Sequence, residues 1–444
     1  MPARSEKPPL LELLANRRMV IALLCGFSSG MPLFFLYQLV PAWLRDEGVD
    51  LKTISLFALV SFPYTWKFAW APLLDRLPPP LLGRRRGWAL ITQIALTLGL
   101  AAMSLLDASA DVERIAWLAG IVAFFSASQD IVLDAHRREL LDDHEFGVGS
   151  SLFVNAYRLS TLVPGSLGLI LADHLSWSQV HLVVAAFMLV GIATTLWMPE
   201  PEVHHEPRSW WRSVADPFIE FIGRGGWRAA LGLLAFMLLY KLGDSMATAL
   251  ITPFYLDVGF SKTEIGTVAK AATLWSFVAG AALAAGLLGR FGVNRSLWIA
   301  GFLQLATILG FAALSEVGRD STLLFVVVSG EYLGVGLGTA VFVTFIGHAV
   351  SRQHTATQFA LLTSFAAVPR TFANAAAGSL IEGVGDWQGL GWTGYFLFCT
   401  ALAIPGMVML WWIAPWNGPE VSAVATKPAR SARSARSARS ARSQ

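Results

Sequence analysis

The sequence has few charged residues and almost no cysteine. Only 14% of its 444 residues are Asp, Glu, Lys or Arg, whereas 55% are hydrophobic. A water-soluble protein of this length needs a much more polar surface, so a soluble enzyme is excluded. The two cysteines, Cys25 and Cys399, both lie in apolar runs, which excludes a disulfide framework and a thiolate metal site. The net charge of +3 is too small to indicate a nucleic-acid-binding protein.

Long apolar runs dominate the chain instead. A helix needs about 20 apolar residues to cross a bilayer, and twelve such runs predict an all-α integral membrane protein with twelve transmembrane helices. The first run lacks a small-residue cleavage site and eleven others follow it, so we expect a retained span and not a signal peptide. The predicted spans are 18–43, 53–74, 87–106, 115–138, 147–172, 179–198, 228–256, 263–288, 294–315, 321–350, 355–381 and 391–414.

The polar segments predict the orientation of these spans. Of the 33 Lys and Arg residues, 23 fall on the side of the termini, 5 on the other side and 5 within helices. Because Lys and Arg concentrate in cytoplasmic loops, both termini are predicted to be cytoplasmic. The chain then divides into a cytoplasmic N-terminus (1–17), two six-helix bundles (18–198 and 228–414), a cytoplasmic linker between them (199–227) and a basic tail (415–444). The Arg-Ser-Ala repeat of the tail predicts a disordered, solvated segment, with contact to anionic membrane lipid as the alternative.

The two bundles repeat each other at an offset of 210 to 214 residues. The segment 41–54 matches 253–265, Arg158 and the residues after it match Arg370 and the residues after it, and Asp75-Arg76 matches Gly289-Arg290. Matches at nearly one offset indicate a duplicated six-helix unit. Because six is an even number, both copies have the same orientation in the membrane. This parallel repeat is typical of transporters whose substrate site lies near the membrane midplane, between the halves.

Charged residues inside the spans mark the candidate site. An ionised side chain at the bilayer centre costs about 2.5 to 3.5 kcal/mol, so it is expected to face a partner or a water-filled cavity. The third, sixth, ninth and twelfth spans have no such residue in their middles and are predicted to face lipid. The charged residues are Lys67, Asp130, Asp134, Arg158, Lys241, Asp244, Lys270, Glu331 and Arg370. Five cations and four carboxylates would suit an anionic or zwitterionic polar solute.

These residue types suggest roles in binding and in proton coupling. Asp130, Asp244 and Glu331 are candidate proton-coupling carboxylates, because a carboxylate that moves between buried and ion-paired surroundings changes its proton affinity. For Asp134, an ion pair at the helix end is the alternative to a functional role, and Lys241 with Asp244 forms either a static pair or a switch. The candidate substrate-binding residues are Lys67, Gln129, Arg158, Lys241, Lys270 and Arg370, the polar Tyr37 and Gln38 of the first span, and the aromatic Trp66, Tyr240 and Trp275, which are suited to stacking on a sugar ring.

Six motifs occur together between Leu24 and Trp412. They are Gly26-Phe-Ser-Ser-Gly-Met-Pro32, Asp50-Leu-Lys-Thr-Ile54, Gly83-Arg-Arg-Arg-Gly-Trp88, Ser126-Ala-Ser-Gln-Asp-Ile-Val-Leu-Asp-Ala135, Tyr240-Lys-Leu-Gly-Asp244 and Ala356-Thr-Gln-Phe-Ala-Leu-Leu362. Together they resemble the inner-membrane muropeptide permease (AmpG) family of the major facilitator superfamily. The resemblance implies proton-driven import of N-acetylglucosaminyl-1,6-anhydro-N-acetylmuramic acid and its peptide forms for peptidoglycan recycling, which in this family also feeds beta-lactamase induction. It implies functional roles for Gly26 or Gly30, Ala127, Gln129, Asp130 and Asp134.

A second resemblance concerns the loop after the second span. Asp75-Arg76 followed by Gly83 and Arg84 to Arg86 resembles the superfamily loop in which an acidic residue and the basic residues after it latch the cytoplasmic side. Asp75, Arg76 and Arg84 are therefore predicted to be gating residues. In the second half, Gly289 stands where the acidic residue would be, which argues against a second latch.

Two alternatives to muropeptide import are open at this point. The first is a transporter of the same superfamily for another anionic polar solute. The second is an intramembrane enzyme, which the sequence disfavours because it has no His-Glu-x-x-His zinc pattern and no nucleophile close to both a base and an orienting acid. We expect no metal and no cofactor, and a monomer that carries a muropeptide together with protons.

Overall fold

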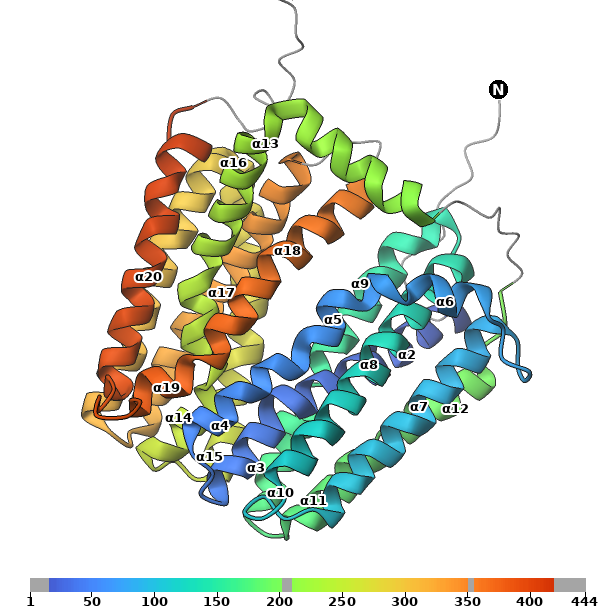
Figure 1. Ribbon diagram of the computed structural model, residues 1–444, viewed down its shortest axis with the longest axis horizontal. Helices are drawn as coiled ribbons and strands as arrows, with labels where there is room; N and C mark the ends of the chain where they lie inside the picture. The colour runs from blue at the N-terminus through green and yellow to red at the C-terminus, as the bar shows by residue number, and fades with distance from the viewer. Residues whose placement is uncertain (1–15, 202–209, 350–354, 419–444) are drawn as a thin grey trace, which may run out of the picture.

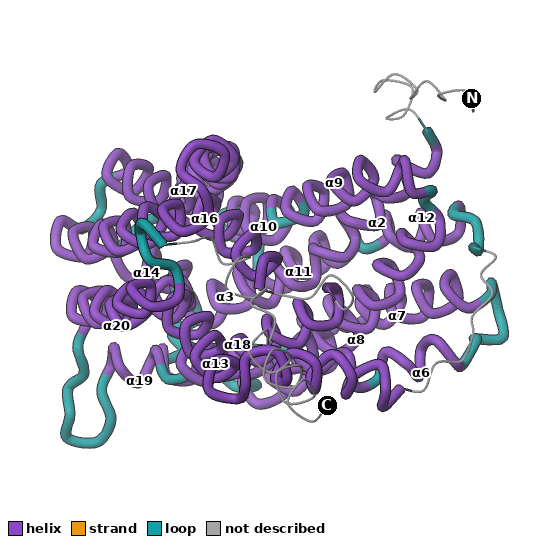
Figure 2. Tube along the Cα trace, turned by 90° about the horizontal axis from the view of Figure 1, so that it is seen from above, coloured by secondary structure: helices purple, strands orange, loops and turns teal. Residues whose placement is uncertain are grey.

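The structure is a computed structural model that describes residues 16–201, 210–349 and 355–418. Regular structure within these ranges is helical, apart from one isolated bridge between Val384 and Trp387. Figure 1 shows two groups of helices, the N half (residues 16–201) and the C half (residues 210–418). Figure 2 shows the same division from above, with α7, α8 and α12 on one side and α14, α17 and α20 on the other.

Several helices of the N half begin at polar capping residues. The Asn16 side chain accepts a hydrogen bond from the backbone of Arg18, and Ser176 and Gln179 form a capping box. The N-half helices are α2 (Arg17–Phe34), α3 (Val40–Asp46), α4 (Leu51–Leu56), α5 (Phe62–Trp66), α6 (Ala71–Arg76), α7 (Arg84–Ala102), α8 (Val112–Leu140), α9 (Asp143–Leu159), α10 (Gly168–Ala172), α11 (Trp177–Ala186) and α12 (Leu189–Trp197). Between them lie the π-helices η1 (Phe35–Leu39) and η5 (Val163–Leu167) and the 3₁₀-helices η2 (Phe57–Ser61), η3 (Lys67–Ala69) and η4 (Met103–Leu105).

The C half contains two long helices, of 40 and 48 residues, that each turn at a glycine. Glycines with positive φ turn the backbone inside both of them, at Gly226 (φ 76°) and at Gly292 (φ 72°). The C-half helices are α13 (Trp210–Ala249), α14 (Ile251–Val258), α15 (Lys262–Glu264), α16 (Lys270–Val317), α17 (Ser321–Ala349), α18 (Thr355–Ala375), α19 (Ala377–Glu382) and α20 (Gly391–Ile413), with the π-helix η6 (Ile265–Ala269) between α15 and α16. The part of α13 before Gly226 lies in the predicted linker, which is therefore helical from Trp210 onward.

The twelve predicted spans are present in the predicted order. Eight helical stretches of the described residues are long and apolar enough to cross a membrane. One of these, Lys262–Val317, contains the eighth and ninth spans joined at the Gly292 turn. The remaining three predicted spans, the second, fifth and eleventh, are interrupted helices that carry Lys67, Arg158 and Arg370. Interrupted, more polar helices are expected where a span lines a cavity and not lipid.

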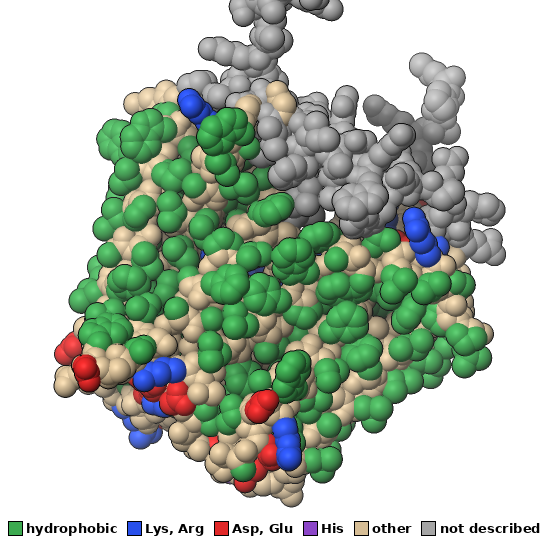
Figure 3. Space-filling view, viewed as in Figure 1, with side chains coloured by type: hydrophobic (Ala, Val, Ile, Leu, Met, Phe, Trp, Pro, Cys, Tyr) green, Lys and Arg blue, Asp and Glu red, His purple; other side chains and the backbone are tan. Residues whose placement is uncertain are grey.

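The outer surface has the character expected of a protein in a bilayer. The space-filling view shows apolar side chains over most of the coloured part of this face, with a group of charged side chains at the end that carries α3, α14 and α15 (Figure 3). The third, sixth and twelfth spans, built from α7, α11 and α12, and α20, lie at the outer edges of the two halves in Figure 1. This placement agrees with the prediction that spans without internal charge face lipid.

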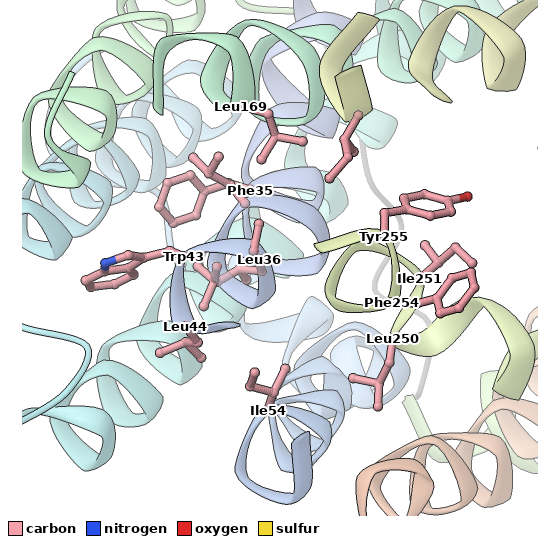
Figure 4. Close-up of a cluster of buried hydrophobic side chains, with 14 of the residues drawn as sticks. Phe35, Leu36, Trp43, Leu44, Ile54, Leu169, Leu250, Ile251, Phe254 and Tyr255 are labelled. Carbon is pink, nitrogen blue, oxygen red and sulfur yellow. The ribbon is translucent and has the colours of Figure 1, made fainter. Parts of the chain in front are cut away.

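The halves meet tightly at one end, which we call the closed end and define by α3, α4, α14 and α15. A cluster of buried apolar side chains joins them there, with Phe35 and Trp43 from the N half and Leu250 and Phe254 from the C half (Figure 4). Apolar contact between the halves excludes water from the closed end.

Candidate functional site

A cavity of about 400 Å³ lies between the halves, next to the closed end. This volume falls within the roughly 300 to 1,000 Å³ of typical small-molecule sites. Residues of the first and second spans form one wall, and residues of the seventh, eighth, tenth and eleventh spans form the other. The polar lining consists of Tyr37, Gln38, Ser55, Ser61, Tyr64, Thr65, Ser245, Thr248, Thr252, Lys270, Tyr332, Arg370, Thr371 and Asn374. Four of the predicted binding residues therefore reach one cavity, namely Tyr37, Gln38, Lys270 and Arg370.

The cavity lining contains two cations and, among the described residues, no carboxylate. Lys270 is only 6% exposed, and its ammonium donates a hydrogen bond of 2.9 Å to the amide oxygen of Gln38. The Arg370 guanidinium donates from Nε to the backbone oxygen of Ala366 in its own helix, at 3.1 Å. The site is therefore electropositive and suits an anionic ligand.

Tyr37 and Tyr64 supply aromatic and hydroxyl groups on the N-half wall. Tyr37 is 48% exposed although it lies inside the protein, because its free surface faces the cavity. The hydroxyl of Tyr64 is buried without a hydrogen-bond partner among the described residues. The sequence analysis missed Tyr64, and the available signal was its position three residues before Lys67 in an interrupted, polar span.

A second group of charged residues is buried inside the C half. The Lys241 ammonium lies 3.2 Å from Oδ2 of Asp244, so these residues form an ion pair within α13. Glu331 is fully buried, and its carboxyl group lies near Thr307 and Asp244 without a hydrogen bond of standard geometry to the described residues. Asp244 and Lys241 are near enough to act on Glu331 electrostatically. A fully buried carboxyl is costly to ionise, which makes Glu331 a candidate for proton coupling.

The N half contains a matching carboxylate in α8. Asp130 accepts a hydrogen bond from the Ser29 hydroxyl, and the Lys67 ammonium lies 3.8 Å from its other oxygen. The neighbouring Gln129 donates to the backbone oxygen of Ser28 at 2.9 Å, which fixes α8 against α2. Ala127, also in α8, is completely buried. Gln129 and Ala127 thus contribute to helix packing and do not line the cavity, which corrects the binding role predicted for Gln129.

The glycines of the first span permit a close helix contact. A Cβ atom at Gly26 would overlap the backbone oxygen of Phe153, and one at Gly30 would overlap that of Tyr157. Both contacts are with α9, so α2 and α9 approach each other at the level of their backbones. Both glycines therefore serve helix packing in this structure.

The three aromatic residues predicted to stack on a sugar lie elsewhere. Tyr240 is buried in the C-half core, where its ring stacks on Phe342 with a centroid distance of 5.6 Å and its hydroxyl donates to the backbone oxygen of Leu297. This placement corrects the prediction, because its ring is covered by the protein. Trp66 is half exposed and stacked on Phe68, and Trp275 is 78% exposed; neither lines the cavity. Sequence position beside a charged residue did not reveal which way each ring points.

Arg158 and the predicted latch residues make contacts outside the cavity. The Arg158 guanidinium lies over the Phe277 ring of the C half, 3.8 Å from its centroid. Asp134 pairs with Arg137 within α8 at 3.1 Å. Asp75 pairs with Arg85 at 2.6 Å, and the Arg84 guanidinium donates to the Asp75 backbone oxygen. The Arg76 side chain is exposed. The carboxylate of Asp75 thus pairs with Arg85, one of the basic residues of the predicted latch, and these contacts stay within the N half.

Ion pairs that join the halves occur at the closed end. Arg45 pairs with Asp257 at 2.6 Å and approaches Glu382 at 3.8 Å, while Lys262 pairs with Asp46 at 2.8 Å and approaches Asp173 at 3.8 Å. Among the residues that the structure describes, these are the ion pairs between the two halves. The sequence analysis assigned them no role, although the offset of 212 residues between Arg45 and Asp257 was a usable signal.

Comparison with known proteins identifies the family to which the chain belongs. Residues 22–329 match the Major Facilitator Superfamily. The chain belongs to this superfamily. Among curated superfamily relatives, the anhydromuropeptide permease of Escherichia coli (strain K12) is 39% identical over 403 residues, which cover 90% of this chain and 80% of the permease. The putative transporter AmpG 4 of Rickettsia conorii is 28% identical, with coverage of 91% of this chain and 98% of that protein.

Solved structures support the same superfamily fold. The nucleoside transporter NupG has a TM-score of 0.68 at 13% identity and covers 89% of this chain and 99% of that chain. A D-xylose-proton symporter has a TM-score of 0.68 at 12% identity and covers 91% of this chain and 98% of that chain. These structures show the fold. The superfamily match and the 39% identical permease show that the protein is a membrane-spanning transporter and not the intramembrane enzyme considered above.

Proposed function

We propose that this protein imports anhydromuropeptides from the periplasm to the cytoplasm together with protons. The observation that carries this proposal is the 39% identity with anhydromuropeptide permease along nine tenths of the chain. The cavity supports it independently, because two cations and a row of hydroxyl and amide groups suit a ligand with sugar hydroxyls and carboxylates. The proposed cargo is N-acetylglucosaminyl-1,6-anhydro-N-acetylmuramic acid and its peptide forms, which are products of peptidoglycan recycling.

The proposed orientation has both termini in the cytoplasm of the bacterial inner membrane. The excess of Lys and Arg on the side of the termini supports this orientation. The closed end then faces the periplasm, and the structure represents a state in which the periplasmic route is shut. Transport requires the alternative state, in which the ion pairs of Arg45 and Lys262 break and the halves rock apart at that end. Because one chain contains the whole cavity, the proposed functional unit is a monomer.

Proton coupling is assigned to carboxylates of the two buried charged groups. Glu331 has the strongest structural support, because it is fully buried and the Lys241–Asp244 pair lies beside it. Asp130 is the N-half candidate, since Lys67 and Ser29 stabilise its ionised form and withdrawal of Lys67 would favour its protonation. Asp244 is the third candidate and would act through its ion-pair partner Lys241. This lysine can form a close ion pair with only one carboxylate at a time.

Counterflow in proteoliposomes tests the cargo. Purified protein is reconstituted with unlabelled solute inside, and entry of labelled anhydro-disaccharide is measured with a panel of competitors. Entry that is competed by anhydro-muropeptides supports the proposal. Entry of other sugar acids or organic anions in preference to the disaccharide would favour the alternative, a superfamily transporter for another anionic polar solute.

A further inference from the structure

Lys270 is buried in the cavity wall without a counter-charge. Its ammonium is held by the amide oxygen of Gln38, and no described carboxylate lies within ion-pair distance of Lys270 or Arg370. An amide oxygen satisfies a hydrogen bond of the ammonium but does not neutralise its charge, so burial of the cation remains costly. A ligand carboxylate would supply the missing charge.

We propose that Lys270 and Arg370 form a carboxylate-binding subsite, and that a bound carboxylate displaces Gln38 from Lys270. This inference rests on the proposed cargo, whose muramic acid carboxylate is the group bound. Lys270 and Arg370 come from the eighth and eleventh spans and line the same cavity. Their placement in the C-half wall directs the anionic part of the cargo toward the C half. On the N-half wall, the uncharged Tyr37, Ser61 and Tyr64 would bind the neutral sugar hydroxyls of the cargo.

Three π-helical turns hold the Gln38–Lys270 pair in place. Gln38 lies in η1, Lys270 directly follows η6, and Gly165 in η5 lies against both. A Cβ atom at Gly165 would overlap the Gln38 amide oxygen and lie 3.1 Å from Cε of Lys270. Wide turns of this kind occur frequently at functional sites, because they displace side chains from the regular helical register. Here they bring an amide and an ammonium from opposite halves into contact.

Gln38 keeps a hydrogen-bond donor when a ligand carboxylate takes its place at Lys270. Its amide oxygen also accepts a hydrogen bond from the Thr161 hydroxyl at 3.0 Å, so it stays satisfied when Lys270 turns to a ligand. Lys270 gains a charged acceptor in place of a neutral one, so the Coulomb attraction between opposite charges is added to the hydrogen bond. The exchange therefore favours the anion.

Displacement of Gln38 also removes one tie between the halves. The Gln38–Lys270 hydrogen bond joins the first span to the eighth next to the closed end. Cargo that competes for Lys270 weakens this tie and lowers the free energy of separating the halves. The subsite would thus couple anion binding to the change of state, which a neutral analogue of the same shape would not do.

Counterflow with a matched pair of probes tests the subsite. The probes are the anhydro-disaccharide acid and its methyl ester, which differ in the charge of one group. We expect the unmodified protein to prefer the acid by about tenfold or more, and Lys270→Met to reduce the preference to about twofold while still transporting the ester. Lys270→Arg should retain the preference, and Arg290→Met, which removes an exposed cation from the same helix, should leave it unchanged.

Gln38→Glu provides a second test that does not remove the lysine. The new carboxylate would pair with Lys270 and compete with the cargo, so affinity for the acid should fall about tenfold while affinity for the ester stays constant. Transport of the acid with an undiminished preference in Lys270→Met, or unchanged acid affinity in Gln38→Glu, would overturn the subsite and leave the proposed function standing. If the unmodified protein carries neither probe, both proposals are refuted.

Discussion

Arg45 and Asp257 occupy equivalent positions in the two repeated halves and bind each other across the interface between them. Their offset of 212 residues equals that of Arg158 and Arg370. The guanidinium makes two hydrogen bonds to the carboxylate, at 2.6 Å and 2.9 Å, and both side chains are less than one quarter exposed. A duplicated unit would place the same residue type at both positions. Divergence to opposite charges turned a repeated position into a contact that holds the closed end together.

Reversal of the Arg45 charge is expected to open the closed end. Arg45→Asp would face Asp257 and Glu382 with a like charge, and loss of a bidentate pair worth about 1 kcal/mol or more shifts the balance of states about fivefold or more. Labelling of a cysteine introduced at Thr248, in the cavity wall, should then increase with a membrane-impermeant maleimide added from the periplasmic side. The native Cys25 and Cys399 are buried and contribute little background.

The double variant Arg45→Asp with Asp257→Arg should restore the low labelling. Arg114→Asp serves as the control, because Arg114 pairs with Asp111 inside the N half and its side chain is 77% exposed. Equal labelling of the Arg45 variant and the control would show that the ion pair does not govern access.

Substitution at Gly30 should abolish uptake through helix packing. Gly30→Leu places a side chain against the Tyr157 backbone and the Ser160 hydroxyl, so α2 and α9 must separate. We expect loss of counterflow with preserved membrane insertion and a thermal midpoint lowered by several degrees. Gly286→Leu is the matched control, since open space surrounds that position. Normal uptake by Gly30→Leu would refute a requirement for the close contact.

Amide substitution should separate cargo exchange from proton-driven accumulation. Glu331→Gln removes the exchangeable proton and keeps the shape, so counterflow should continue while accumulation against a gradient falls to unity. A membrane potential of 100 mV supplies about 2.3 kcal/mol per net charge moved. For a cargo without net charge, such as the methyl ester, this is about fiftyfold accumulation per proton, which the variant would lose. Asp130→Asn and Asp244→Asn are measured alongside. Protonophore-sensitive accumulation in all three variants would exclude coupling through these carboxylates.

Tyr240 and Tyr37 are expected to respond oppositely to removal of the hydroxyl. Tyr240→Phe leaves the Leu297 carbonyl without its donor in the C-half core and should lower the free energy of unfolding by about 1 kcal/mol, with unchanged affinity for the cargo. Tyr37→Phe changes a cavity wall and should weaken cargo affinity with little effect on stability. Thermal unfolding and counterflow of both variants provide the comparison. A weakened affinity in Tyr240→Phe would place that residue in the binding site after all.

The sequence could not show which way each charged or aromatic side chain of a span points. Lys241, Lys270 and Arg370 are all cations inside spans, but Lys241 pairs with Asp244 whereas the other two line the cavity. Trp275, five residues after Lys270, points away from the cavity lined by that lysine. Such differences arise from helix rotation and from the wide turns η1 and η6, which hydropathy does not report.

The sequence alone determined the class, the number of spans, the duplication and the set of intramembrane charges. These properties follow from local composition, because a bilayer demands about 20 apolar residues per helix and penalises each charge inside it. Only the tertiary structure decided which charges share a cavity and which neutralise each other. It also decided that Arg45 meets Asp257 and that Lys270 meets Gln38. The reason is that these contacts cross between the two halves, and their distances are set by how the halves pack together, which no local pattern of residues specifies.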